Sequence, residues 1–220
     1  MSPKRLEHFH LEALGLKLFF GTERVSDEVI EALYELAEEA QVYDKMQALQ
    51  AGEIVNFIEG VSCEQRAALH TAMRDIFSSP REEKNAKEAA FLAQKEIEKL
   101  KKTASLLDSF TDLVQIGIGG SSLGPEAIYL GLEAYCQKGK KVHFVSNVDP
   151  DEIAHLFRQL DLRKTVVVVV SKSGSTLETL TNESFAREKF KRAGLDPRHH
   201  FIAVTAEKSP LDHLVVPDVR

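Results

Sequence analysis

Two short stretches of the chain combine glycine with serine and threonine directly after an apolar run. They are "GIGGSSLGPEA" (117–127) and "SKSGSTLET" (171–179), about 50 residues apart. Glycine lets the backbone approach a ligand closely, hydroxyl groups donate hydrogen bonds, and the amino end of a following helix carries partial positive charge. Together these groups can hold a phosphate without many cationic side chains. The two stretches therefore predict a phosphate-type anion site.

Helix capping is the alternative explanation for part of the same residues. Ser175 and Glu178 match the S-x-x-E capping box, and Pro125 with Glu126 resembles an ordinary helix start. Capping would account for one or two hydroxyls. It leaves three further serines without a role: Ser121, Ser171 and Ser173. We favour the anion site and keep capping as the competing hypothesis.

Nucleotide-binding fingerprints fit these residues poorly. A dinucleotide site calls for G-x-G-x-x-G, but Ser122 stands in the third glycine position, and Ser146-Asn147 ends the next strand without an acidic residue. A P-loop needs Gly-Lys followed by Ser or Thr, which Gly139-Lys140-Lys141 does not provide. A nucleotide-binding oxidoreductase is therefore the weaker alternative. Two serine-rich loops fit a small phosphorylated molecule better.

The second half of the chain alternates strand and helix patterns, and both stretches lie in it. We predict strands in four short apolar runs: 113–119, 141–147, 165–171 and 200–205. Helical patterns separate the runs: 125–137, 149–160 and 176–194. The unbroken valines of 166–170 are typical of a strand covered on both faces. The pattern predicts an α/β fold with a parallel sheet, whose strand ends position the glycine and hydroxyl residues.

The first half of the chain is predicted to be a charge-rich helical arm. Ser26 should cap a first helix, and a second is predicted over Glu64–Phe77. A third, over 78–107, would use Ser79 as N-cap and Pro80 at the first helical position. We interpret its many charges as a solvated helix face. Loops are predicted at 21–23 and 50–53.

Composition excludes several classes of function. The chain has 220 residues, 43% hydrophobic and 28% charged, with a formal net charge of −6. Nucleic acid and anionic membranes require clustered Lys and Arg, which an acidic protein of this kind does not offer. Cys63 and Cys136 form no CxxC motif, which favours a reducing compartment. With no signal peptide and no apolar run of about 18 residues, we expect a soluble, cytoplasmic protein without nucleic-acid or membrane partners.

The two stretches, together with an upstream one, resemble the glucose-6-phosphate isomerase family. "GIGGSSLGPEA" and "VVSKSGSTLET" are similar to the phosphate-binding half of that family's sugar isomerase (SIS) domain. "CEQRAALHTAMRD" (63–75) is similar to a family segment outside the sugar-binding core, through six residues: Glu64, Arg66, Leu69, His70, Ala72 and Arg74. The resemblance covers roughly residues 45–205.

The resemblance implies which residues bind substrate. Gly120 and Ser121 would contact the sugar at the first stretch. The second stretch would hold the phosphate through Ser171, Lys172, Ser173 and Thr176, with Gly174 and Ser175 shaping the loop. The chain departs from the family in several positions. Ser122 stands where Asp is frequent, Ser173-Gly174-Ser175 where Thr-Phe-Thr is, Cys63 where Thr is usual, and Met73 where Leu is.

The resemblance also implies the fold and the reaction. The fold would be a three-layer, SIS-type sandwich of flavodoxin-like topology, with an N-terminal arm over 1–105 and an incomplete SIS domain over 106–220. The family interconverts glucose 6-phosphate and fructose 6-phosphate through a cis-enediol, as a homodimer, without cofactor or metal. Its proton-transferring groups would lie beyond Arg220, so we expect an N-terminal fragment that is inactive alone. A non-enzymatic SIS-domain regulator that binds phosphosugars is the alternative.

Overall fold

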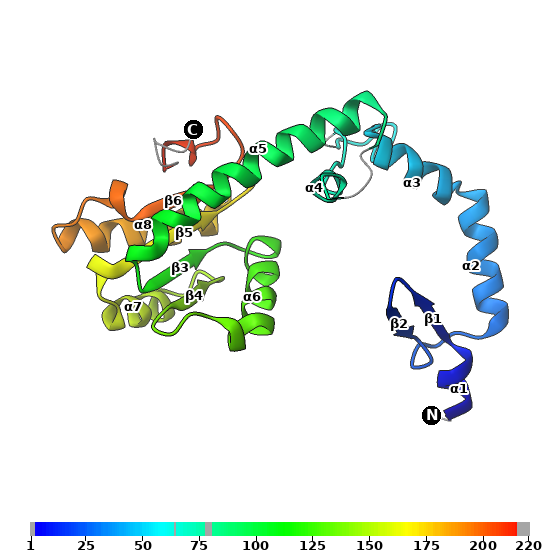
Figure 1. The fold of residues 1–220 in the computed structure, drawn as a ribbon, viewed down its shortest axis with the longest axis horizontal. Coiled ribbons are helices and arrows are strands. Elements are labelled where there is room, and N and C mark those ends of the chain that lie inside the picture. Colours follow the sequence, from blue (N-terminus) through cyan, green and yellow to red (C-terminus); the bar gives the residue numbers. More distant parts are fainter. Residues whose placement is uncertain (1–2, 64, 78–80, 215–220) are drawn as a thin grey trace. The chain divides into compact units, whose positions relative to one another are not determined.

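The computed structural model describes residues 3–63, 65–77 and 81–214 (Figure 1). The chain divides into two compact units, Met1–Lys95 and Glu96–Arg220. Helix α5 (Lys84–Leu106) runs from the first unit into the second. The boundary between 105 and 106 stays a prediction.

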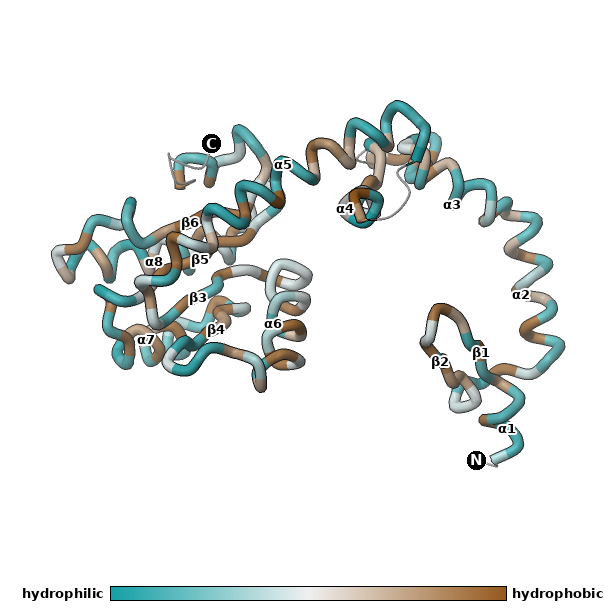
Figure 2. Tube along the Cα trace, in the orientation of Figure 1, coloured by the Kyte–Doolittle hydropathy of each residue, from teal (hydrophilic) through white to brown (hydrophobic). Residues whose placement is uncertain are grey.

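The first unit contains short helices and a hairpin. Its elements are α1 (Pro3–His8), β1 (His10–Ala13), β2 (Leu16–Phe19), α2 (Asp27–Glu39), α3 (Val42–Ala51) and α4 (Ala72–Asp75). The turn between β1 and β2 is formed by Leu14 and Gly15, both with positive φ, which matches the twist of a two-residue hairpin. Helix α2 begins after Ser26, as predicted, although the Ser26 side chain forms no capping bond to the helix. Hydrophilic and hydrophobic residues alternate along it (Figure 2).

The predicted helix over Glu64–Phe77 is largely wrong. Glu64 lies outside the described residues, and only Ala72–Asp75 is helical. Gln65 has a φ of 44°, a left-handed conformation that a helix interior does not accept. An amphipathic segment of this length forms a helix only when its apolar stripe finds a packing surface. Here the helical periodicity of the sequence alone is not sufficient.

The predicted bounds of one helix and one loop in the first half of the chain are also wrong. The helix predicted over 78–107 begins at Lys84, so Glu82 and Glu83 precede it. Ser79 and Pro80 lie outside the described residues. The loop predicted at 50–53 is shorter, because α3 continues to Ala51 and ends against Gly52, whose φ is 90°.

The second unit is built on a parallel sheet, as predicted. Its strands are β3 (Asp112–Ile116), β4 (Lys141–Val145), β5 (Thr165–Val170) and β6 (Phe201–Val204). The four strands lie in the order β4-β3-β5-β6, and every neighbouring pair is parallel. This is the start of the flavodoxin-like order, in which the second strand lies outside the first. The predicted α/β class and topology are confirmed.

Helices cover both faces of this sheet, which gives three layers (Figure 1). The connecting helices are α6 (Gly120–Leu132), α7 (Pro150–Gln159) and α8 (Leu177–Arg192). Single 3₁₀ turns join consecutive elements at Leu107–Ser109, Glu133–Tyr135, Leu162–Lys164 and Pro197–His199, and a further one, Asp212–Leu214, follows β6. On the opposite face from α7 and α8, the ring of Tyr129 in α6 lies 5.9 Å from that of Phe144 in β4.

The main core lies between the sheet and helices α7 and α8. Its residues are apolar and come from alternate strand positions, both helices and the segment after β6: Val114, Ile116, Val145, Ile153, Phe157, Val167, Val169, Ala186, Phe190, Phe201, Leu211 and Leu214. The hydrophobic run of β5 supplies the middle of the sheet (Figure 2). His200 is also structural, because its Nδ1 lies 2.9 Å from the backbone oxygen of Thr165. The core thus fixes the strand ends at which the candidate residues lie.

A carboxylate at the start of β3 provides a pH-dependent part of this stability. Burial raises the pKa of Asp112, but hydrogen bonds from His143 (2.9 Å) and Thr111 (2.8 Å) outweigh it and place the pKa below its ordinary value. A lowered pKa stabilises the fold above the unfolded-state pKa and ceases to do so as the pH falls through the folded-state value. Asp112→Asn should therefore lower the free energy of unfolding by about 1 kcal/mol at neutral pH.

Urea unfolding followed by circular dichroism at several pH values measures this effect. The difference between wild type and Asp112→Asn should stay constant near neutrality and shrink below about pH 4. The exposed Asp108 gives a matched control, since Asp108→Asn should change stability little. A difference that grows on acidification would contradict the assignment.

Candidate functional site

The candidate site lies where the two central strands of the sheet end. Ile116 of β3 pairs with Val169 of β5, so the segments after them leave the same edge. Helix α6 follows β3 onto one face of the sheet, whereas α8 follows β5 and packs on the other. In open α/β sheets, ligands bind in the crevice at this point, outside the carboxyl ends of the strands. We call residues 117–122 the glycine loop and residues 171–176 the hydroxyl loop.

The glycine loop turns directly into a helix. A Cβ atom on Gly117 would lie 2.7 Å from the backbone oxygen of Ser121, so only glycine allows this close approach. Gly119, with a φ of 58°, is the N-cap, and α6 begins at Gly120. Gly120 and Ser121 therefore lie in the first helical turn, where the Ser121 amide already donates to the oxygen of Ile118 over 3.2 Å.

The expectation that this helix starts at Pro125 is wrong. Pro125 lies inside α6 and has no N–H to offer the oxygen of Ser121 four residues earlier. Gln115 of β3 replaces that donor, because its Nε2 lies 2.7 Å from the Ser121 oxygen. Gln115 is buried, and the sequence signal for it is a single amide side chain inside an apolar strand. This contact fixes the glycine loop on the sheet.

The hydroxyls of the hydroxyl loop are arranged in two pairs. Ser171 Oγ and Thr176 Oγ1 are 3.1 Å apart, and Ser175 Oγ donates to Ser173 Oγ over 2.9 Å. Backbone amides add to both pairs: Gly174 donates to Ser171 Oγ and Ser175 to Ser173 Oγ. Lys172, between the pairs, is exposed. The loop is thus ordered through its own side chains.

The capping hypothesis for Ser175 and Glu178 is wrong. The N-cap of α8 is Thr176, one residue later, and no side-chain capping bond is formed there. The Ser175 hydroxyl turns back to Ser173 instead. The serines and the threonine are therefore not accounted for by the start of the helix.

Two of these hydroxyls can donate to a ligand. Ser173 Oγ accepts two bonds from Ser175, so its own proton is not used in them. Ser171 is 3% exposed, so its proton is best placed on Thr176 Oγ1, since a buried donor without acceptor is costly. That arrangement leaves the Thr176 proton available. Two hydroxyl donors beside a lysine and a helix amino end suit an anion.

Two further hydroxyls, which the sequence analysis did not assign to a ligand, lie in the same helical turns. Ser122 Oγ in α6 and Thr179 Oγ1 in α8 each occupy the third helical position and are 1% exposed. Among the described residues, neither atom has a hydrogen-bond partner. A buried hydroxyl in this state costs about 1–3 kcal/mol. Both are therefore polar groups for which the fold alone gives no reason.

A separate pocket of about 280 Å³ lies at the opposite, amino-terminal end of the strands. Its lining is mostly apolar and includes Leu107, Leu113, Tyr129 and Val142. Lys140 also lines it, but its Nζ donates to three backbone oxygens at 2.6–3.2 Å: those of Leu107, Asp108 and Phe110. This pocket lacks the donor set of the two loops, so we do not place the anion site there.

The described residues offer no other chemistry of comparable kind. No three His, Cys, Asp or Glu side chains within them gather in a way that could hold a metal ion. His8 Nε2 instead lies 2.6 Å from Asp27 Oδ1, and His10 Nδ1 lies 2.7 Å from the oxygen of Glu7. Among the described residues as a whole, no helix is long and apolar enough to cross a membrane.

Comparison with known proteins places this geometry in a family. The family model described as phosphoglucose isomerase matches residues 19–219. A glucose-6-phosphate isomerase of Protochlamydia amoebophila is 52% identical over 217 residues, which is 97% of this chain and 40% of that protein. One of Desulfotalea psychrophila is 41% identical over 221 residues, covering 96% of this chain and 41% of that protein.

A solved structure agrees with the sequence relatives. The crystal structure of a glucose-6-phosphate isomerase from Chlamydia trachomatis matches with a TM-score of 0.81 and 41% identity, over 96% of this chain and 41% of that one. The chain thus spans about 40% of the length of the relatives it matches. By its sequence along nearly its whole length, and by its fold, the chain belongs to the phosphoglucose isomerase family.

Proposed function

We propose that this chain supplies the sugar-phosphate-binding half of an isomerase that interconverts glucose 6-phosphate and fructose 6-phosphate, in glycolysis and gluconeogenesis. Family membership supports the reaction. The observation that carries the binding role is the hydroxyl loop, whose Ser173 and Thr176 each keep a proton for an acceptor. Such donors bind a phosphate dianion more strongly than a neutral group, because bonds to charged acceptors are the stronger ones.

The proposed roles follow the two loops. The hydroxyl loop holds the phosphate through the side chains of Lys172, Ser173 and Thr176. Ser171 acts through Thr176, to which it donates, while Gly174 and Ser175 set the shape of the loop. Gly120 offers its first-turn amide to the sugar, and Ser121 offers its hydroxyl, because the Ser121 amide donates to the oxygen of Ile118. The helix dipoles of α6 and α8 add partial positive charge at the same edge, which allows a protein of net charge −6 to bind an anion locally.

We further propose that these 220 residues do not catalyse the isomerisation. The reaction opens the sugar ring and moves a proton between C1 and C2 through a cis-enediol, which needs a positioned acid and base. Neither loop offers a histidine or carboxylate among the residues assigned to substrate. We place the proton-transferring groups in the part of the relatives' length that this chain does not span.

The remaining expectations belong to the same proposal. The complete enzyme would work without cofactor or metal, as a homodimer in the cytoplasm, with no nucleic-acid or membrane partner. The net charge of −6 supports the last point, because polyanionic partners require clustered cations.

Calorimetric titration of the purified chain tests the binding role. Fructose 6-phosphate and glucose 6-phosphate should bind saturably, inorganic phosphate more weakly, and NAD not at all. Isomerase activity, measured in a coupled assay on protein from a host that lacks its own enzyme, should be absent.

Each outcome decides between the alternatives. Saturable NAD binding would favour a nucleotide-binding oxidoreductase, and no response to either sugar phosphate would refute the binding role. Measurable turnover would overturn the proposed inactivity. A phosphosugar-binding regulator is recognised by two results together. The longer protein that contains this chain would bind sugar phosphate but would not isomerise it.

A further inference from the structure

The segment that follows β6 lies directly against the hydroxyl loop. Gly174 is buried with a φ of 66°, and a Cβ atom there would lie 2.7 Å from Ser209 Oγ and 2.8 Å from Ser209 Cβ. Pro210 Cδ would be 3.2 Å away. A real Cβ does not approach other atoms so closely, so glycine at 174 is what allows Ser209 its place.

Backbone hydrogen bonds join the hydroxyl loop to the end of β6 and to the segment that follows it. The amide of Ser171 donates to the oxygen of Val204 over 3.1 Å, and that of Ala206 donates to the oxygen of Lys172 over 3.2 Å. These bonds continue the pairing of β5 with β6 beyond the strand ends. The hydroxyl loop is therefore held from one side by the chain after β6, in addition to its own side-chain pairs.

Ser209 is itself held in place. Its Oγ lies 2.7 Å from Thr205 Oγ1 and accepts the amide of Leu211 over 3.2 Å. Leu211 and Leu214 are 1% and 7% exposed and belong to the main core. The segment over 205–214, which we call the brace, is thus anchored by apolar burial at its far end.

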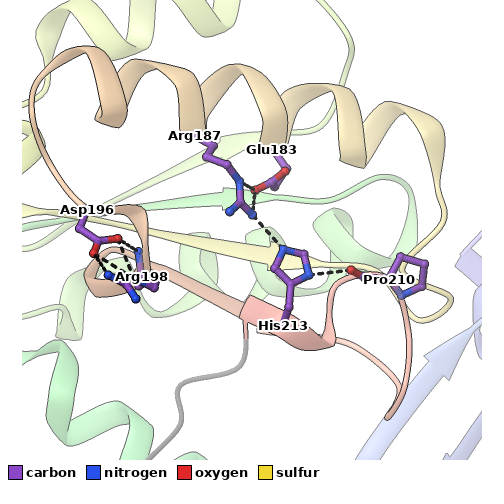
Figure 3. A network of polar contacts seen from close by, with 6 residues as sticks. All are labelled: Glu183, Arg187, Asp196, Arg198, Pro210 and His213. Atoms are coloured by element: carbon purple, nitrogen blue, oxygen red, sulfur yellow. Dashed lines mark hydrogen bonds and ion pairs between the residues drawn. The ribbon is translucent and has the colours of Figure 1, made fainter.

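A polar network ties the brace to α8 (Figure 3). Glu183, whose side chain is 9% exposed, pairs with Arg187, and Arg187 Nη2 reaches His213 Nε2 over 3.3 Å. His213 Nδ1 lies 2.8 Å from the oxygen of Pro210. A carbonyl oxygen only accepts, so the His213 proton lies on Nδ1 and Nε2 accepts from Arg187. A chain of contacts therefore runs from α8 to the residue next to Ser209.

We propose that the brace sets the conformation of the hydroxyl loop, with Ser209 and His213 as positioning residues for sugar-phosphate binding. Neither residue is assigned to the ligand. Ser209 acts through Gly174, and His213 acts by fixing Pro210 against α8. The consequence for binding rests on the proposed function, whereas the consequence for loop order does not.

The first test uses the contact between Gly174 and Ser209. Gly174→Ala should weaken fructose 6-phosphate binding about tenfold, since the methyl group displaces Ser209 or the loop. Ser209→Gly removes the obstructing atoms, so the double variant should bind more tightly than Gly174→Ala alone. Part of the loss should remain, because alanine is strained at a φ of 66°. Independent, additive effects of the two changes would overturn the role of Ser209.

The second test reads the loop without any ligand, by amide hydrogen exchange. His213→Ala should speed exchange about tenfold at three amides: that of Ala206, which bonds the brace to the loop, that of Ser171, which bonds the loop to the end of β6, and that of Gly174, which bonds within the loop. The amides of β3 should be unchanged, because a local opening does not require global unfolding. Arg198→Gln is the matched control, since Arg198 pairs with Asp196 in an exposed network of its own (Figure 3).

The two readouts separate failure of the inference from failure of the proposed function. Unchanged exchange at Ser171, Gly174 and Ala206 in His213→Ala, with the protein folded, would overturn the positioning role of His213. If exchange speeds up equally in β3, His213 and its network only stabilise the whole fold and do not position the loop. Faster loop exchange in His213→Ala, together with a wild-type chain that binds no sugar phosphate, would support the brace and refute the binding site.

Discussion

Replacing Ser173 with alanine and Thr176 with valine in one chain is expected to weaken fructose 6-phosphate binding about a hundredfold. Each hydroxyl keeps a proton that the internal hydrogen bonds do not use. A hydrogen bond to a charged acceptor contributes about 1.5 kcal/mol or more, which corresponds to roughly tenfold for each donor. Calorimetric titration of the two single variants and the double variant measures the loss of affinity for each hydroxyl and for both together.

Matched variants separate the hydroxyl donors from the shape of the loop. Thr176→Ser keeps the hydroxyl and should bind nearly as wild type, whereas the isosteric Thr176→Val should not. Ser175→Ala should lose less than about threefold, because the Ser175 hydroxyl donates within the loop and the Ser173 proton remains available. Wild-type affinity in the folded double variant would contradict the assignment of both donors.

The sheet of the second unit could be predicted from sequence because its signal is local. Strands buried on both faces read as uninterrupted apolar runs, and Val166–Val170 is such a run. The start of α7 is also set by local contacts. The side chain of Asp149 accepts hydrogen bonds from the amides of Asp151 and Glu152, which lie within three residues of it. Where the determining contacts are near in sequence, pattern and structure agree.

The first unit shows where such patterns stop being sufficient. The helical periodicity around Glu64–Phe77 predicted a long helix, but Gln65 adopts a left-handed conformation and only four residues are helical. The hairpin of β1 and β2 was not predicted, because its strands have four residues each and its turn, Leu14-Gly15, is not among the common hairpin pairs. Short elements depend on packing that the local sequence does not encode.

The candidate site, too, could be predicted from the sequence only in part. The residue types that could bind a phosphate were visible as hydroxyls and glycines after apolar runs. Their partners were not, because the contacts that set the loops come from elsewhere in the chain. Gln115 replaces the donor that Pro125 lacks, and Ser209 lies against Gly174 from 35 residues downstream in the sequence. Which hydroxyl keeps a free proton follows only from these geometries.

Phe190→Ala should produce the largest loss of stability in the second unit, about 3–5 kcal/mol in the free energy of unfolding. Phe190 is fully buried in α8, and its ring lies 5.2 Å from that of Phe201 in β6 and 6.3 Å from that of Phe157 in α7. The alanine would leave a cavity among side chains fixed by three different elements, which cannot all relax into it. Urea unfolding followed by circular dichroism measures the loss.

Phe185→Ala provides the comparison, because Phe185 lies in the same helix and also contacts Phe157, at 6.3 Å, but is only partly buried. It should lose clearly less stability, since less apolar surface leaves the core. Equal losses would show that Phe190 is not the centre of the packing. Bound fructose 6-phosphate should stabilise wild type and Phe190→Ala alike by mass action, because the ligand binds the folded chain. The same ligand should stabilise the chain less once Thr176→Val is added, because that variant binds it more weakly.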